Sequence, residues 1–199
     1  MLFRSTVTAT PNFGSSTLVG KVGSDDVTLV TAGGTAAFAD KTVATGKTVT
    51  ISGLVLGGTT ASRYSLTQPT TTANITAATL TVNGITSNNK TYDGLASATS
   101  LLNTGSASLS GVIGADVVTL VTGSATGTFP DKNVGTGRTV TIAGLTLTGT
   151  DAANYSLTQP TTTASITAKG LTVSGVTAND KTYRSEEHTS ELQSHHDLV

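Results

Sequence analysis

Any chemistry in this chain would have to come from aspartate, lysine and tyrosine. Residues 1–183 contain no His, Cys or Glu, so the commonest general bases and nucleophiles are missing from them. Four of the eight aspartates in this part stand directly beside Gly, Asn or Lys, and we interpret all eight as turn-forming residues. They are Asp25, Asp26, Asp40, Asp93, Asp116, Asp131, Asp151 and Asp180. We therefore expect no enzyme activity and no catalytic residue.

Metal and cofactor sites are not expected either. The chain has no cysteine and shows no spacing typical of an EF-hand, a phosphate-binding loop or a zinc site. The turn that begins at Asp131 could offer oxygen atoms to calcium, but it holds one carboxylate, too few for tight binding. A covalent link between a lysine and an Asn or Asp is conceivable, with Lys90 and Lys132 as candidates, although the Glu that usually assists is absent.

Two short motifs contain the residues that we expect to be structural. These residues are Lys90, Tyr92, Asp93, Gly94, Asp151 and Tyr155. In KTYDG, Tyr92 is expected to bury its ring, while Asp93 accepts local backbone hydrogen bonds and Gly94 takes a positive φ in a turn. In DAANYSL, Asp151 precedes Tyr155 by four residues, the spacing of the tyrosine corner in immunoglobulin-like domains.

The elements that position these motifs are predicted to be β-strands. Branched or apolar residues alternate with Thr, Ser or Gly in VTLVT, TVTIS, LTLTG, YSLTQ and SITA, and helix signals are nearly missing. Turn signals recur about every ten residues, which favours tandem immunoglobulin-like β-sandwiches. The alternative is a β-grasp-like or other open sheet, which would need a packed helix.

In one predicted strand the apolar residues switch from one face to the other. Val49 and Ile51 share one face of TVTISGL, whereas Leu54 and Leu56 fall on the opposite parity. A bulge or bend near Gly53 would restore the register, because glycine accepts the backbone angles that a bulge needs. Two separate strands joined by a tight turn are the alternative. Gly144 occupies the equivalent place.

The chain repeats itself with a period of 91 residues. GKVGSDDVTLVT from Gly20 matches GVIGADVVTLVT from Gly111, and the match continues without a gap to NNKTY and NDKTY. This period is too long for a solenoid repeat and suits an independent domain. We predict a partial module lacking its first strand at 1–78, a complete module at 79–169, and the first strand of a third module at 170–183.

The last residues differ from the rest. Every Glu and every His lies within residues 184–199. RSEEHTSELQS resembles the in-frame translation of a sequencing adapter, so we interpret this segment as a non-native, disordered tail and exclude it from the reasoning. A genuine polar extension is the alternative.

The motifs together carry a family resemblance. KTYDG, GADVVTL and NYSLTQP resemble the YDG-type repeat domain of bacterial surface proteins, such as filamentous-haemagglutinin-like adhesins. The resemblance covers nearly all of residues 1–183 and departs from the pattern after Tyr183, where Asp and Gly should follow. It implies secretion or an outer-surface location, although the chain shows no signal peptide.

The expected role is that of a structural spacer or stalk, with neighbouring repeats of the same chain as partners. Charged residues make up 12% of the chain and aromatic residues 4%, which argues against a nucleic-acid partner. No apolar run is long enough to insert into a membrane. The alternative is an adhesive module that binds a host glycan or protein directly. A weaker alternative is an accessory module of a secreted enzyme.

Overall fold

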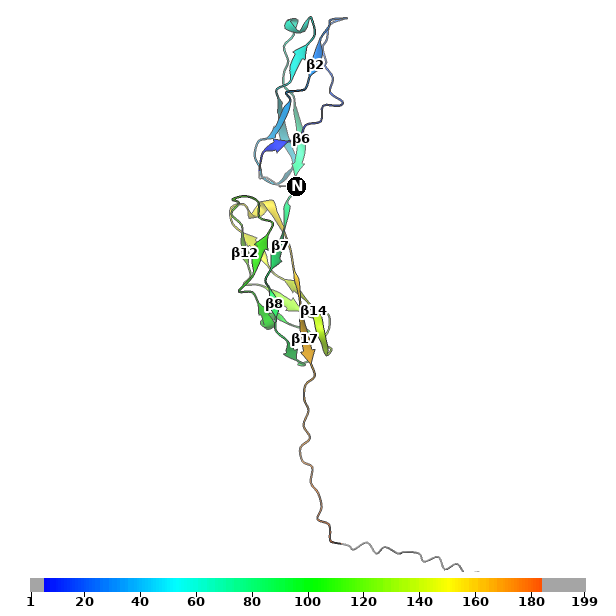
Figure 1. Ribbon diagram of the computed structural model, residues 1–199, viewed down its shortest axis with the longest axis vertical. Helices are drawn as coiled ribbons and strands as arrows, with labels where there is room; N and C mark the ends of the chain where they lie inside the picture. Colours follow the sequence, from blue (N-terminus) through cyan, green and yellow to red (C-terminus); the bar gives the residue numbers. More distant parts are fainter. Residues whose placement is uncertain (1–5, 184–199) are drawn as a thin grey trace, which may run out of the picture. The chain divides into compact units, whose positions relative to one another are not determined.

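The computed structural model describes residues 6–183 and shows an all-β chain made of several small sheets (Figure 1). The predicted all-β class is confirmed. In the described residues the helical elements are three single 3-10 turns, η1 (Ala61–Arg63), η2 (Thr99–Leu101) and η3 (Ala152–Asn154). The interpretation of residues 184–199 as a disordered tail lies outside the described residues.

The first repeat, residues 1–78, has one larger and one smaller sheet. Its strands are β1 (Thr8–Ala9), β2 (Thr28–Val30), β3 (Thr35–Phe38), β4 (Ala44–Ser52), β5 (Val55–Gly57) and β6 (Thr70–Ile75). The larger sheet has the order β1-β3-β4-β6 and is antiparallel throughout, while β2 pairs with β5.

The second repeat, residues 79–169 with Ala78 joined to its first strand, contains the counterparts of these two sheets and two more. Its strands are β7 (Ala78–Asn83), β8 (Thr86–Ser87), β9 (Lys90–Thr91), β10 (Leu102–Asn103), β11 (Ser108–Ser110), β12 (Thr119–Val121), β13 (Thr126–Thr128), β14 (Gly135–Ala143), β15 (Thr146–Thr148), β16 (Tyr155–Thr158) and β17 (Thr161–Thr167). The sheet orders are β13-β14-β17-β9, β11-β7-β16, β12-β15 and β10-β8.

Two strand pairs of the second repeat are parallel. β16 pairs in parallel with β7, and β17 pairs in parallel with β9, whereas β14 and β17 lie antiparallel side by side (Figure 1). Parallel pairing between segments so far apart in sequence cannot come from a hairpin, because a parallel pair needs a crossover connection. The strands β7 and β9 at the start of the repeat therefore pair with the strands β16 and β17 at its end.

Alternation along the strands explains where the core lies. In β14, Val140 and Ile142 are buried while Thr139 and Thr141 face solvent, as the period of two requires. Val140 packs with Phe129, Ala98 and the two inward residues of β17, and Ile142 packs with side chains of β7. Threonine suits the outward positions because it combines high strand propensity with a hydroxyl.

The parity break at glycine separates two strands. β4 ends at Ser52 and β5 begins at Val55 in another sheet, with Gly53 between them at φ +76°. The bulge interpretation near Gly53 is wrong, and the alternative of two strands joined by a tight turn is correct. The bulge in β4 lies between Ala44 and Lys47 instead.

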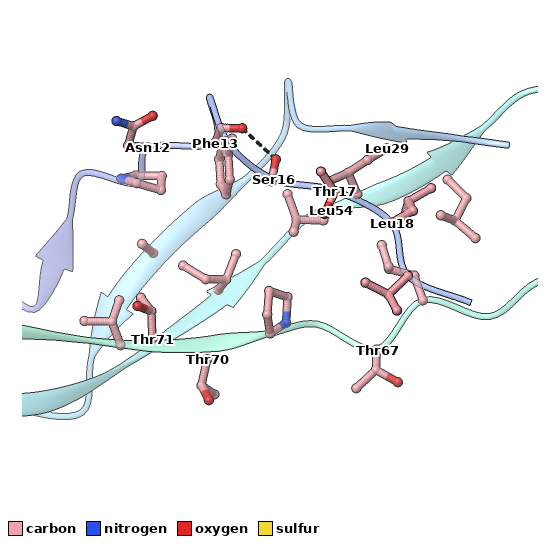
Figure 2. Close-up of a pocket in the computed structure, with 18 of the residues that line it drawn as sticks. Asn12, Phe13, Ser16, Thr17, Leu18, Leu29, Leu54, Thr67, Thr70 and Thr71 are labelled. Carbon is pink, nitrogen blue, oxygen red and sulfur yellow. Dashed lines mark hydrogen bonds between the residues drawn. The ribbon is translucent and has the colours of Figure 1, made fainter. Parts of the chain in front are cut away.

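The core of the first repeat is open on one side. Its buried cluster of Ala36, Val49, Ile51 and Leu54 faces a groove of about 820 Å³ whose wall includes Leu18 (Figure 2). In the second repeat, Leu80 and Val82 of β7 are 0% and 7% exposed, and Val82 packs in a core cluster with Ile142 and Leu145.

Residues 170–183 follow the unit that ends at Lys169. They contain no strand, and the apolar side chains of Leu171, Val173 and Val176 are 93%, 86% and 79% exposed.

Candidate functional site

The KTYDG segment forms a tight turn around one lysine. Lys90 Nζ lies 2.9 Å from Asp93 Oδ1 and donates to the carbonyl oxygens of Leu95 at 2.7 Å and Ser97 at 3.0 Å. Asp93 Oδ1 also accepts from the backbone N–H of Leu95 at 2.9 Å. Gly94 has φ +84°, so the prediction of a positive φ at this position is confirmed. These contacts hold the turn together.

The electrostatics of this turn follow from its burial. The side chain of Lys90 is 8% exposed and its ammonium lies 5.7 Å from the centre of the Phe129 ring. The hydrogen bond from Lys90, together with that from the Leu95 N–H, holds the pKa of Asp93 below its ordinary value. Tyr92 is half-buried and packs against the core cluster that contains Phe129.

The second predicted motif places Tyr155 against the GADVV turn. Its hydroxyl donates to Asp116 Oδ2 at 2.8 Å and accepts from the backbone N–H of Ile113 at 3.0 Å. These partners lie 39 and 42 residues upstream, whereas a tyrosine corner bonds to the backbone a few residues away. Burial is the main reason that the pKa of Tyr155 is raised.

Asp151 also binds the backbone of the GADVV turn. Its Oδ2 accepts the backbone N–H of Val117 at 2.9 Å, and this bond is the largest cause of the lowered pKa of Asp151. Asp116 and Asp151 therefore stand together at the end of the second repeat, with side chains 8% and 19% exposed. Two neighbouring carboxylates favour a cation between them.

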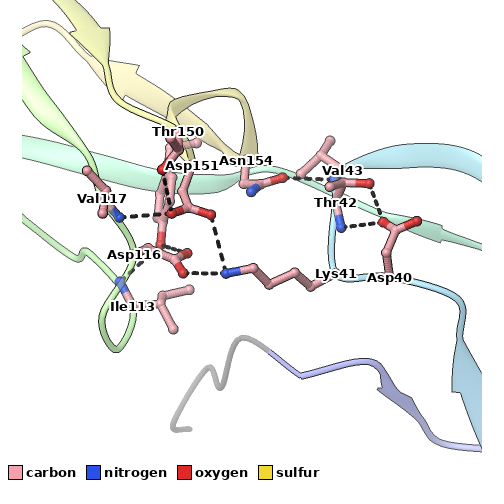
Figure 3. A network of polar contacts seen from close by, with 11 residues as sticks. Asp40, Lys41, Thr42, Val43, Ile113, Asp116, Val117, Thr150, Asp151 and Asn154 are labelled. Carbon is pink, nitrogen blue, oxygen red and sulfur yellow. Dashed lines mark hydrogen bonds and ion pairs between the residues drawn. The ribbon is translucent and has the colours of Figure 1, made fainter.

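A lysine of the first repeat supplies that cation (Figure 3). Lys41, in the loop between β3 and β4, places its Nζ 2.6 Å from Asp116 Oδ1 and 3.3 Å from Asp151 Oδ1. The hydrogen bond to Asp116 is the first cause of the raised pKa of Lys41. Beside it, the backbone N–H of Val43 donates to Asn154 Oδ1 at 3.0 Å. We call these five residues the junction network.

The matching positions of the first repeat hold different residues. Thr60 stands in place of Asp151, and Arg63 in place of Asn154. Arg63 Nη1 approaches the carboxylate of Asp25, the counterpart of Asp116, at 3.7 Å. Within residues 6–183, Lys132, the counterpart of Lys41, has no ion-pair partner. The second repeat thus has two adjacent aspartates that bind a lysine of the preceding repeat, whereas the first repeat has Thr60 in place of one of them.

The sequence motifs contain part of this network. Of its five residues, Asp151 is predicted to be structural and Asp116 to form a turn, whereas Lys41, Val43 and Asn154 carry no prediction. Tyr155, also predicted to be structural, donates to Asp116 from outside the network. The available signal was the difference between copies at Thr60/Asp151 and Arg63/Asn154, two polar exchanges inside an otherwise similar segment. The KTYDG residues, in contrast, lie in their own turn and do not belong to the junction network.

Two glutamines without a predicted role also bind the backbone at the strand ends. In each repeat the side chain of the Gln in LTQP makes two hydrogen bonds to the backbone of the residue that follows the strand-separating glycine. Gln68 does so at Leu54 and Gln159 at Leu145, each accepting from the backbone N–H and donating to the backbone carbonyl. Their side chains thus replace the ladder bonds lost where β4 and β14 end.

The described residues offer little for other chemistry. Among residues 6–183, no three His, Cys, Asp or Glu side chains come together as ligands of a metal ion would. No helix in this part of the chain is long and apolar enough to span a bilayer. The polar groups of the junction network are ion-paired or hydrogen-bonded with each other, an arrangement suited to holding two segments together.

Comparison with known proteins identifies one family. The sequence profile of the YDG domain matches residues 5–73 and 76–164, one match for each repeat. The search of curated proteins found no significant match. The search of solved structures likewise found none. The two matched segments together cover most of the chain, which therefore belongs to the YDG domain family.

Proposed function

We propose that these repeats are structural spacers that hold a neighbouring domain at a distance in a bacterial surface or secreted adhesin. The observation that carries this proposal is the junction network, in which Lys41 of one repeat lies between two carboxylates of the next. A lysine in such a position links consecutive modules without binding any small ligand.

The link between the repeats supports the same role. Only Thr76 and Ala77 separate β6 from β7. A connection this short leaves little freedom, in contrast to a Gly- or Ser-rich linker. Together with the ion pairs it would restrict motion between the two repeats, as a stalk requires. We also propose that each complete repeat is a sandwich-type module, since its small sheets share cores of inward-facing aliphatic side chains.

The absence of catalytic activity and an extracellular or outer-surface location are parts of this proposal. They rest on the family and on the mechanical character of the network. A module that itself binds a host glycan or protein would need an exposed recognition surface, so a glycan array with the whole chain separates the two roles. Specific binding that survives loss of the junction network would contradict a purely mechanical role.

The proposal predicts coupled motion of the two repeats. In ¹⁵N relaxation measurements on the chain, both repeats should tumble with one correlation time. Lys41→Ala should separate the two correlation times and lower each, because the ion pairs to Asp116 and Asp151 are lost. Lys132→Ala is the matched control, since this counterpart has no ion-pair partner among residues 6–183. Independent tumbling already in the unchanged chain would overturn the proposal.

A further inference from the structure

The second repeat begins and ends with segments that run side by side in the same direction. Tyr155 pairs with Ala78 at one end of the repeat, and Thr167 pairs with Thr91 at the other. Partners along β16 are 77 residues apart in sequence and those along β17 are 76 apart, so the offset hardly changes. The two segments are therefore parallel along the whole repeat, and the arrows of β7 and β17 point the same way in Figure 1.

Neither the entry strand nor the exit strand of this repeat lies at the edge of a sheet. The chain enters through β7, which lies between β11 and β16, and leaves through β17, which lies between β14 and β9. An edge strand can be peeled away from its one neighbour, whereas an interior strand must break its pairing on both sides. The two strands on which a stretching force would act are thus each held from two sides.

Apolar side chains fix the register of both strands. In β7, Leu80 is 0% exposed and lies opposite Leu157, and Val82 packs with Ile142. In β17, Ile166 is 1% exposed and belongs to the core cluster that contains Phe129. Sliding either strand by one residue would turn these side chains to the opposite face of the sheet. Movement of one segment along the other is therefore resisted by the core as well as by the backbone.

The KTYDG turn secures the far end of the parallel segments. The backbone N–H of Tyr92 donates to the carbonyl oxygen of Thr167 at 2.8 Å, and the hydroxyl of Thr167 donates to the carbonyl oxygen of Lys90 at 3.3 Å. Just before this turn, Asn89 Oδ1 accepts from the backbone N–H of Ser165 at 2.7 Å. The last strand of the repeat is thus bound to the turn that the buried lysine holds together.

We propose that the second repeat is a force-resisting module in which the parallel first and last segments form a mechanical clamp. A force that stretches the chain pulls β7 and β17 in opposite directions along their axes. Because the two segments run in the same direction, they must slide past each other, and all their hydrogen bonds bear the force together. In an antiparallel hairpin pulled from its two ends, each bond in turn bears the whole force.

The use of this resistance rests on the proposed spacer function, since a stalk is stretched when the domain that it carries is held. The resistance itself is a property of the second repeat and is measured within it. A low rupture force would leave the junction network as the link between the repeats. Independent tumbling of the two repeats would, conversely, leave the clamp intact. Failure of one proposal is thus distinguishable from failure of the other.

The direction of pulling tests the clamp. The chain has no cysteine, so pairs of introduced thiols define where the handles of a single-molecule force experiment attach to the whole chain. Ala77→Cys with Lys169→Cys places the handles at opposite ends of the parallel segments. Thr91→Cys with Lys169→Cys places both at the same end, where force peels β9 from β17. All three positions are exposed, so both proteins keep the same fold and stability.

The first pair of handles should give rupture at about twice the force of the second pair or more, because both parallel strand pairs share the load instead of β9 alone. Rupture should occur in one event that releases about 300 Å of chain, the extended length of the segment between the handles. Equal rupture forces in the two directions would overturn the proposal.

Matched substitutions locate the resistance within the repeat. Asn89→Ala removes a hydrogen bond between the parallel segments, whereas Asn103→Ala removes hydrogen bonds across the antiparallel pair of β10 and β8. With the first pair of handles, Asn89→Ala should lower the rupture force, and Asn103→Ala should leave it unchanged. An equal decrease in both variants, or no decrease with Asn89→Ala, would contradict the clamp.

Discussion

At the scale of single residues, the ion pair between Lys90 and Asp93 stabilises the KTYDG turn. Lys90 is nearly buried, and Asp93 is the one carboxylate among its hydrogen-bond partners. A buried ammonium needs a charged or polar partner to offset its desolvation. Asp93 also accepts from the Leu95 N–H, so one side chain neutralises the lysine and closes the turn.

Asp93→Ala should therefore lower the melting temperature of the chain by several degrees at neutral pH. Because the pKa of Asp93 is lowered in the folded chain, its stabilising effect is fully present above its ordinary value of about 4 and is lost as the pH falls through the lowered folded pKa. Melting curves from pH 7 to pH 2 should show the two proteins converging at the acid end.

Asp180→Ala is the control for this change, since Asp180 lies in the segment without strands and should leave the melting temperature unchanged. If Asp93→Ala melts like the unchanged chain at pH 7, the aspartate is not structural. A binding function for the motif would then have to be considered.

At the scale of elements, two glycines decide where strands end. Gly53 and Gly144 have φ of +76° and +79°, and a Cβ at Gly144 would lie 2.2 Å from the carbonyl oxygen of Ser124. The backbone of the preceding loop passes so close that no side chain fits. The chain can therefore leave one sheet at Ala143 and enter another at Thr146.

Gly144→Ala should destabilise the second repeat by about 1–3 kcal/mol from the positive φ alone, with a further loss from the overlap with Ser124. Urea denaturation should show a lower midpoint with an unchanged slope. Gly105→Ala is the matched control, because Gly105 has an ordinary φ and open space around its Cβ. A change within about 0.5 kcal/mol is expected there, and equal effects of both substitutions would contradict the close approach.

At the scale of the whole molecule, the junction network makes consecutive repeats unequal. In the second repeat, Asn154 leaves the carboxylate of Asp116 accessible to Lys41, whereas Arg63 approaches the equivalent carboxylate of Asp25 from within the first repeat. An internal guanidinium competes with an incoming lysine for the same oxygen atoms. We therefore expect the residue at this position to set how firmly a repeat holds its predecessor.

Asn154→Arg should accordingly loosen the junction. Spin labels at Thr48→Cys and Thr139→Cys, two exposed strand positions in different repeats, should give a narrow distance distribution in the unchanged chain and a broad one in the variant. The reciprocal Arg63→Asn is the control, because Arg63 pairs with Asp25 inside the first repeat and does not belong to the junction network. A narrow distribution in both variants would show that the short link alone sets the geometry.

Local patterns determined much of this protein. Alternation of Thr with Val, Ile or Leu predicted the strands, the Asp93–Gly94 pair predicted a turn with positive φ, and the 91-residue offset predicted two related modules. Each of these signals depends on neighbouring residues or on the comparison of one repeat with the other, so the sequence alone contains the information. The YDG domain, which KTYDG and NYSLTQP indicate in the sequence, is confirmed by the match of its sequence profile to both repeats.

Tertiary structure decided the rest, because it depends on which distant segments meet. The parity break at Gly53 was compatible with a bulge or with two strands, and only the pairing of β5 with β2 distinguishes them. The parallel insertion of β7 beside β16, the meeting of Lys41 with Asp116, and the groove left open in the first repeat have no local signature. Each of these features is stabilised by contacts between residues that lie tens of positions apart in the sequence. A local sequence pattern does not specify which distant segments will meet.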